Sequence, residues 1–166
     1  MSDVIYYTAP INIRQSDTSA ANSTVWAMRN DSGSTKTIFI EYIKLNLSFD
    51  AVTPVTRSLQ RYDFVRFTTA TPTGGNSITA IPWQSFNPSS QVTDIRYLDT
   101  GLSTTSVSFG TPIFTVGIPA TDSAIAPFES ANIPVVLAPG EGLCFRLTNT
   151  AVIGQGMTGF ISWSEK

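Results

Sequence analysis

Short runs of alternating apolar and polar residues, separated by Gly, Pro, Asn and Asp, recur along the whole chain. The apolar members are largely Val, Ile, Phe and Tyr, and many of the polar members are Ser and Thr. β-Branched and aromatic side chains fit the half-buried surface of a pleated sheet, and helical signals are almost absent. The sequence therefore predicts an all-β protein made of many short strands.

The clearest strand is predicted at residues 36–49, which read KTIFIEYIKLNLSF. Its apolar residues move from even to odd positions near Tyr42 and Ile43. This change indicates a β-bulge, or a strand that passes from one sheet to the other. A tight turn is predicted at Pro139-Gly140-Glu141-Gly142. The other expected strands cover residues 23–29, 58–69, 77–81, 92–98, 104–109, 112–117, 133–137, 143–148 and 157–164.

The length of 166 residues is that of one domain, and the sequence shows neither a repeat of fixed period nor an internal linker. Residues 1–22 pass from an apolar into a polar stretch and are predicted to form an extended N-terminal arm and linker. Residues 23–166 are predicted to form a single antiparallel β-sandwich. Long strands and long connections favour a jelly-roll-like topology, since the Cys, Trp, Cys spacing of an immunoglobulin-like sandwich is missing.

Charged residues make up 13% of the chain, against about 25% in typical globular proteins, and the net charge is −2. This composition fits a surface covered by other subunits, because charges are depleted at the centre of protein–protein interfaces. It fits an ordinary sandwich rich in Ser and Thr equally well. Binding to nucleic acid needs clustered Lys and Arg, and we expect no such partner here. The one local group, Arg57, Arg61 and Arg66, is interpreted as a solvated or inter-subunit strand face.

The chain contains no histidine, which excludes Ser-His-Asp and Cys-His catalysis and the usual zinc sites. Cys144 is the single cysteine and is predicted to be a small core residue. No Gly-rich phosphate loop is present. We therefore expect a protein without enzymatic activity, metal or cofactor. Of two carboxylate chemistries that remain, glycoside hydrolysis by a pair of acids is the less favoured.

The other carboxylate chemistry is that of the aspartic proteases. Asp99-Thr100-Gly101 resembles their Asp-Thr-Gly signature, and Val152-Ile153-Gly154 follows at roughly the interval seen in the small dimeric members. Leu102 follows the motif where Ala or Ser is usual, and the motif comes late in the chain. Asp-Thr-Gly is also a good turn, because Asp bonds the backbone and Gly accepts positive φ. The turn is the favoured interpretation, and a protease using Asp99 is a remote alternative.

Three tryptophans raise the question of ligand stacking. Trp26 and Trp163 lie inside expected strands and are predicted to be core residues. Trp83 follows Pro82 and lies near Phe86 in an expected loop, so these two rings are candidates for exposed aromatic contacts. They indicate either a loop anchored on the sandwich or a carbohydrate- or receptor-binding module of a phage tail or fibre.

Several segments together carry a resemblance to a known class of virion protein. The chain resembles the head decoration (cement) proteins of tailed phages in residues 24–49, 59–75, 94–101 and 137–165. The resemblance implies a jelly-roll-like sandwich, often trimeric, that binds the outer surface of the capsid at three-fold positions and stabilises it. It implies no cofactor, and no family site residue is carried over.

We therefore expect a structural virion protein on the outer capsid surface, made in the host cytoplasm. The first residues lack the pattern of a signal peptide, and no apolar run approaches the ~18 residues of a membrane helix. The expected partners are other copies of the chain, with a trimer favoured, and the major capsid protein or another virion protein. The arm is expected either to contact these partners or to pair with its own sheet as an edge strand. Its predicted contact residues are Val4, Ile5, Tyr6, Tyr7, Ile11 and Ile13.

Overall fold

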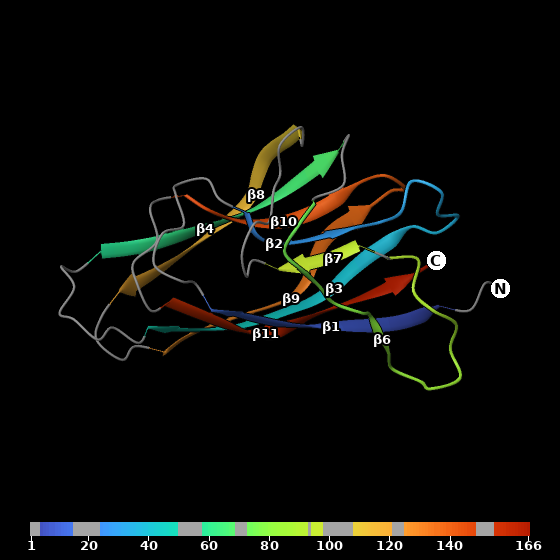
Figure 1. Ribbon diagram of the computed structural model, residues 1–166, viewed down its shortest axis with the longest axis horizontal. Coiled ribbons are helices and arrows are strands. Elements are labelled where there is room, and N and C mark those ends of the chain that lie inside the picture. Colours follow the sequence, from blue (N-terminus) through green and yellow to red (C-terminus); the bar gives the residue numbers. More distant parts are fainter. Residues whose placement is uncertain are drawn as a thin grey trace.

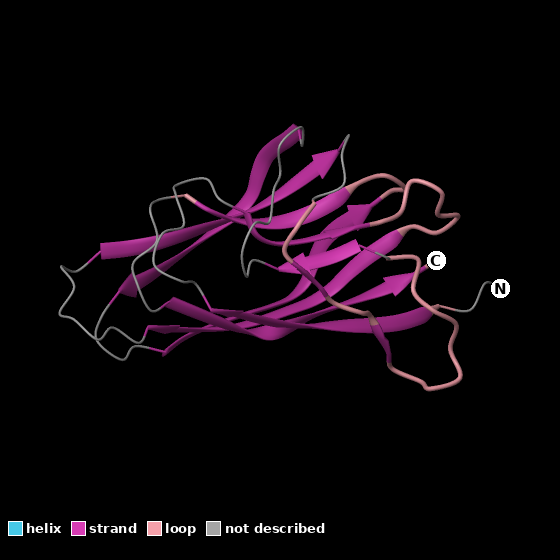
Figure 2. Cartoon of the chain, viewed as in Figure 1, coloured by secondary structure: helices cyan, strands magenta, loops and turns pink. Residues whose placement is uncertain are grey.

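The computed structural model of the chain describes residues 4–14, 24–49, 58–68, 73–92, 94–97, 108–120, 125–148 and 155–166. Within these residues all regular structure is β-strand (Figure 2). Two antiparallel sheets lie face to face as a β-sandwich, which confirms the predicted fold class (Figure 1).

Each sheet has a defined strand order. The five-stranded sheet runs β6 (Ile81–Pro82), β1 (Ile5–Arg14), β11 (Gln155–Glu165), β3 (Ile38–Phe49) and β9 (Ile125–Leu137). The six-stranded sheet runs β5 (Asn76–Ser77), β7 (Asp94–Tyr97), β2 (Thr24–Arg29), β10 (Gly142–Leu147), β4 (Ser58–Thr68) and β8 (Ser108–Ala120).

The strand pairing is nested. Strand β1 pairs with β11, β2 with β10, β3 with β9 and β4 with β8, all antiparallel. Successive pairs alternate between the two sheets, so the chain is one long hairpin that has been rolled up. This is the jelly-roll arrangement. Strands β5, β6 and β7 come between β4 and β8 in sequence, and they extend both sheets beside β1 and β2.

The N-terminal segment is part of the sandwich. Residues 5–14 form β1, which pairs with β11 along its whole length, so they are not the separate arm predicted from the sequence. Two of its predicted contact residues, Tyr7 and Ile11, are buried in the core of the chain itself and are not surface groups. The alternative prediction, in which this segment pairs with its own sheet, fits residues 5–14. Residues 15–22 and the side chain of Ile13 lie outside the description.

The change of apolar parity in β3 is a β-bulge, as predicted. Ile40 pairs with Trp163 and Tyr42 pairs with Ser162, so Glu41 is an extra residue between them. The pairing of β3 with β9 shifts at the same place. Because of this bulge, Ile40 and Ile43 both face the core although their positions differ in parity.

The core between the sheets is built on aromatic side chains. Trp26 stacks on Phe145 with ring centroids 4.7 Å apart, and Phe64 lies 4.2 Å from Phe145. Trp163 stacks on Tyr7 at 6.0 Å. Both Trp26 and Trp163 are fully buried, which confirms their predicted core role. Such pairs stabilise the fold by about 0.5–1.5 kcal/mol beyond the burial of their area.

The long strands near the sheet edges carry proline. Strands β8 and β9 contain two prolines each, and β1 contains Pro10. Tyr6 of β1 accepts a hydrogen bond from the Trp83 backbone on the β6 side. Backbone N–H and C=O groups alternate in direction along a strand, so the backbone groups of Tyr6 and Pro10 point to the same side of β1. Proline has no N–H, so Pro10 offers no donor on that side. Prolines at edges disfavour the addition of a further strand.

Gly159 tests the packing of β11 against β3. Its φ is +154°, and a Cβ there would lie 1.9 Å from the backbone oxygen of Lys44. We expect Gly159→Ala to lower the free energy of unfolding by about 2–3 kcal/mol, because backbone must move. Urea unfolding measures this. Gly110→Ala is the control, since its Cβ would meet Arg66 at an ordinary 3.5 Å. Equal stabilities of the two variants would contradict the register.

Candidate functional site

One segment leaves the regular sandwich and carries its most exposed aromatic rings. Residues 78–92 cross from β5 in one sheet to β6 in the other and then return toward β7 (Figure 1). The Ile78 amide donates to the Ile95 carbonyl at 2.8 Å, and the Trp83 amide donates to the Tyr6 carbonyl at 3.0 Å. A turn closes where the Asn87 amide donates to the Gln84 carbonyl at 3.0 Å. The segment is therefore tied to both sheets by its backbone.

A buried carboxylate holds the returning half of this segment. Glu165 is only 3% exposed. It accepts hydrogen bonds from the Ser90 hydroxyl at 2.5 Å and from the Gln91 amide at 3.1 and 3.2 Å. The indole N–H of Trp163 donates to it at 3.3 Å. Burying a carboxylate is costly unless donors replace water, and these donors do so.

Tyr7 makes a second tie to the same segment. Its hydroxyl donates to the Pro88 carbonyl at 2.9 Å. Burial raises the pKa of Tyr7, and the negative charge of Glu165 raises it further. The phenol therefore keeps its proton and remains a donor at neutral pH.

Exposed apolar side chains gather on the outer face of β1 and β6. Pro82 pairs with Tyr7, which points inward, and this places Trp83 beside Tyr6 on the outer face. The two rings lie 5.9 Å apart at 41°. Ile81 shares this face and is 53% exposed. We call Tyr6, Ile81 and Trp83 the aromatic patch. Its exposed fractions of 44% for Tyr6 and 64% for Trp83 are large for such side chains.

The two predicted sets of contact residues therefore meet in space. Val4, two residues before Tyr6, is 39% exposed, and Ile5 is half-buried. Phe86, in the turn that follows Trp83, is 82% exposed, as expected for an aromatic contact. The Trp83 ring is exposed and does not anchor the loop. Tyr7 and Glu165 anchor it instead.

Sequence reasoning missed Glu165 as the anchor. It shares its strand parity with Ile161 and Trp163, and all three are buried. The available signal was an acidic residue on the apolar side of a strand. A carboxylate buried there needs several hydrogen-bond donors, so it predicts a contact with another segment. Its partners in the loop lie far away in sequence and carry no local pattern.

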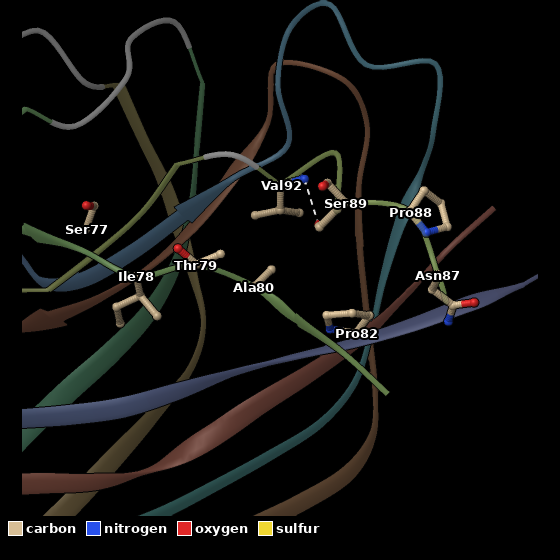
Figure 3. Close-up of a pocket in the computed structure, with 10 residues that line it drawn as sticks. Ser77, Ile78, Thr79, Ala80, Pro82, Asn87, Pro88, Ser89 and Val92 are labelled. Carbon is tan, nitrogen blue, oxygen red and sulfur yellow. Dashed lines mark hydrogen bonds between the residues drawn. The ribbon is translucent and has the colours of Figure 1, made fainter. Parts of the chain in front are cut away.

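A pocket of about 340 Å³ opens between the two halves of the same segment (Figure 3). Residues 77–82 form one wall and residues 87–92 form the other. We call it the loop pocket. Pro82 and Asn87, which line it, are the direct chain neighbours of Trp83 and Phe86.

Other residues singled out in the sequence lie elsewhere. Cys144 is buried beside Val65 and Phe67, in a small cluster separate from the main core. Arg61 is exposed and Arg66 is half-buried, whereas Arg57 is outside the described residues. The motifs at 99–101 and 152–154 are also outside them.

The described residues contain no group of three or more Cys, Asp, Glu or His side chains placed to hold a metal. Nor do they contain a helix long and apolar enough to cross a membrane.

The geometry thus joins a jelly-roll sandwich, an aromatic patch and a neighbouring pocket on one anchored segment. No protein family model, curated protein or solved structure matches this chain.

Glu165→Ala tests the loop anchor. We expect a loss of about 1–3 kcal/mol in unfolding free energy, because the Ser90 and Trp163 donors lose their acceptor. We also expect faster hydrogen exchange at the Gln91 amide, measured by NMR. Glu41→Ala is the control. Glu41 accepts a hydrogen bond of 2.6 Å from the Ser164 hydroxyl, and this bond does not involve the loop. Unchanged protection of the Gln91 amide would refute the anchor.

The Cys144 thiol should be unreactive in the folded protein. Burial raises the pKa of its thiol to about 12, and the charge of Arg146 offsets this only in part. Since the thiolate is the reactive form, we expect no labelling by a disulfide reagent at pH 8 under native conditions. Full labelling should appear in urea. Rapid labelling of native protein would show that the thiol is accessible.

Proposed function

We propose that this chain is a structural virion protein that associates with its own copies and docks on the outer surface of a phage capsid. The jelly-roll fold supports the proposal because it is a common architecture of viral capsid domains. Lectin domains share the same architecture, so the fold alone does not decide between these roles.

The aromatic patch is the observation that carries the proposal. Trp and Tyr are enriched among the residues that dominate the energy of protein interfaces. Here Tyr6 and Ile81 lie on the paired strands β1 and β6, and the Trp83 amide donates to the Tyr6 carbonyl, so their backbone positions are fixed before any contact forms. A preorganised surface loses less conformational entropy on binding than a mobile one. These properties favour a docking surface.

The sheet edges favour contact through side chains over strand addition. An unprotected edge would let a neighbouring chain extend the sheet. The prolines of β1, β8 and β9 work against this. In our proposal the copies therefore meet through faces and loops.

A trimer is the proposed oligomer. Head-to-tail contacts between identical sandwiches close into a ring when three copies are related by a three-fold axis. A trimer offers three copies of the aromatic patch to the shell, and multivalent binding strengthens attachment without new types of contact. The proposed capsid partner is the major capsid protein or another virion protein.

The double variant Tyr6→Ser/Trp83→Ser tests the proposal. Both side chains are exposed, so we expect the fold to be retained by circular dichroism. Loss of two interface aromatics should weaken association or capsid binding by at least about tenfold. Light scattering gives the oligomer mass, and co-sedimentation with capsids gives the affinity.

Ile113→Ser is the matched control, since Ile113 is 40% exposed on β8 in the other sheet. It should keep the parent mass and affinity. The proposed function would be refuted if the parent protein were monomeric and did not bind capsids. It would also be refuted by a double variant that behaves as the parent does.

A further inference from the structure

The loop pocket has stiff walls. On one side, the Val92 amide donates to the Ser90 hydroxyl at 2.9 Å (dashed line in Figure 3), and Ser90 in turn donates to Glu165. Tyr7 holds the carbonyl of Pro88. On the other side, the backbone bonds of Ile78 and Trp83 tie residues 77–82 to both sheets. The pocket is thus formed before any ligand arrives, as small-molecule sites usually are.

Among the described residues, the polar groups that line the pocket are all neutral. Hydroxyls come from Ser77, Thr79, Ser89 and Ser90, and an amide comes from Asn87. The Ser90 hydroxyl is occupied by Glu165 and Val92. Within the described residues, the side chains of Thr79, Asn87 and Ser89 make no hydrogen bond. They are available as donors and acceptors to a ligand.

The rest of the lining is apolar and shallow. It comes from Ile78, Ala80, Pro82, Pro88 and Val92. A ligand that matches this wall needs a neutral hydroxyl-bearing edge and a C–H-rich face. An anionic ligand would need Arg or Lys, and the described lining residues include neither. A fully apolar ligand would leave the hydroxyls and the amide unpaired.

The size of the pocket limits the ligand. The volume of about 340 Å³ is near the lower end of the range of about 300–1,000 Å³ for ligand pockets, which suits a single sugar unit.

We propose that the loop pocket binds a neutral saccharide. One sugar unit occupies the pocket and hydrogen-bonds Thr79, Asn87 and Ser89. This site goes beyond the proposed assembly role and does not depend on it.

An NMR titration tests the site. The probes are maltotetraose, cellotetraose, tetra-N-acetylchitotetraose and a galactose tetrasaccharide, with a sialylated trisaccharide and an apolar tripeptide for comparison. We expect a neutral saccharide to shift the amides of residues 77–92 saturably. Thr79→Val/Asn87→Ala should weaken this binding by about tenfold or more, because it removes two hydrogen-bonding groups.

The control is Asn12→Ala/Thr111→Val, which removes the same groups from exposed positions on β1 and β8. It should bind as the parent does. The proposal fails if no neutral probe binds, if the acidic sugar or the peptide binds in preference, or if the pocket variant retains full affinity. The pocket variant should keep the oligomer mass and capsid affinity of the parent, so this failure is separable from failure of the assembly role.

Discussion

The pairing of β1 with β11 is the constraint on which the rest of the fold depends. Ten consecutive residue pairs, from Ile5 with Glu165 to Arg14 with Gly156, join strands from opposite ends of the sequence. This outermost pair of the rolled hairpin places Tyr7, Trp163 and Glu165 on adjacent strands of one sheet. The segment between β5 and β7 bonds to Tyr7 and Glu165, and Trp163 donates to Glu165. A different register would turn alternate side chains to the opposite face and remove the anchor.

Local patterns predicted the features that local residues decide. The shift of apolar parity around Tyr42 revealed the bulge in β3, and the position of Trp26 and Trp163 within alternating runs revealed their burial. The loop position of Trp83 and Phe86 made them candidates for exposure, but it left open whether they anchor the loop. The turn at 139–142 was also predictable, since Gly140 adopts a φ of +86°.

Features set by distant partners were not predictable. An apolar alternating stretch such as residues 4–13 looks the same whether it is an arm or a strand of its own sheet, and only its pairing with β11 distinguishes the two. Residues 104–109 and 112–117 were predicted as two strands because Gly110 and Pro112 interrupt the run. Strand β8 nevertheless runs from Ser108 to Ala120, and shifts in its register against β4 accommodate the interruption. The contact of Ser90 with Glu165 spans 75 residues and has no local signature.

The position of β5, β6 and β7 in the roll has a consequence for variation. They are inserted between β4 and β8, the innermost pair of the nested hairpin. A change of length or sequence there leaves the registers of the three outer pairs untouched, because each of those pairs is set by its own residues. Loops on a rigid scaffold tolerate such changes far better than the strands do. The segment that carries Trp83, Phe86 and the loop pocket can thus change in sequence and length while the strand pairs of the framework stay the same.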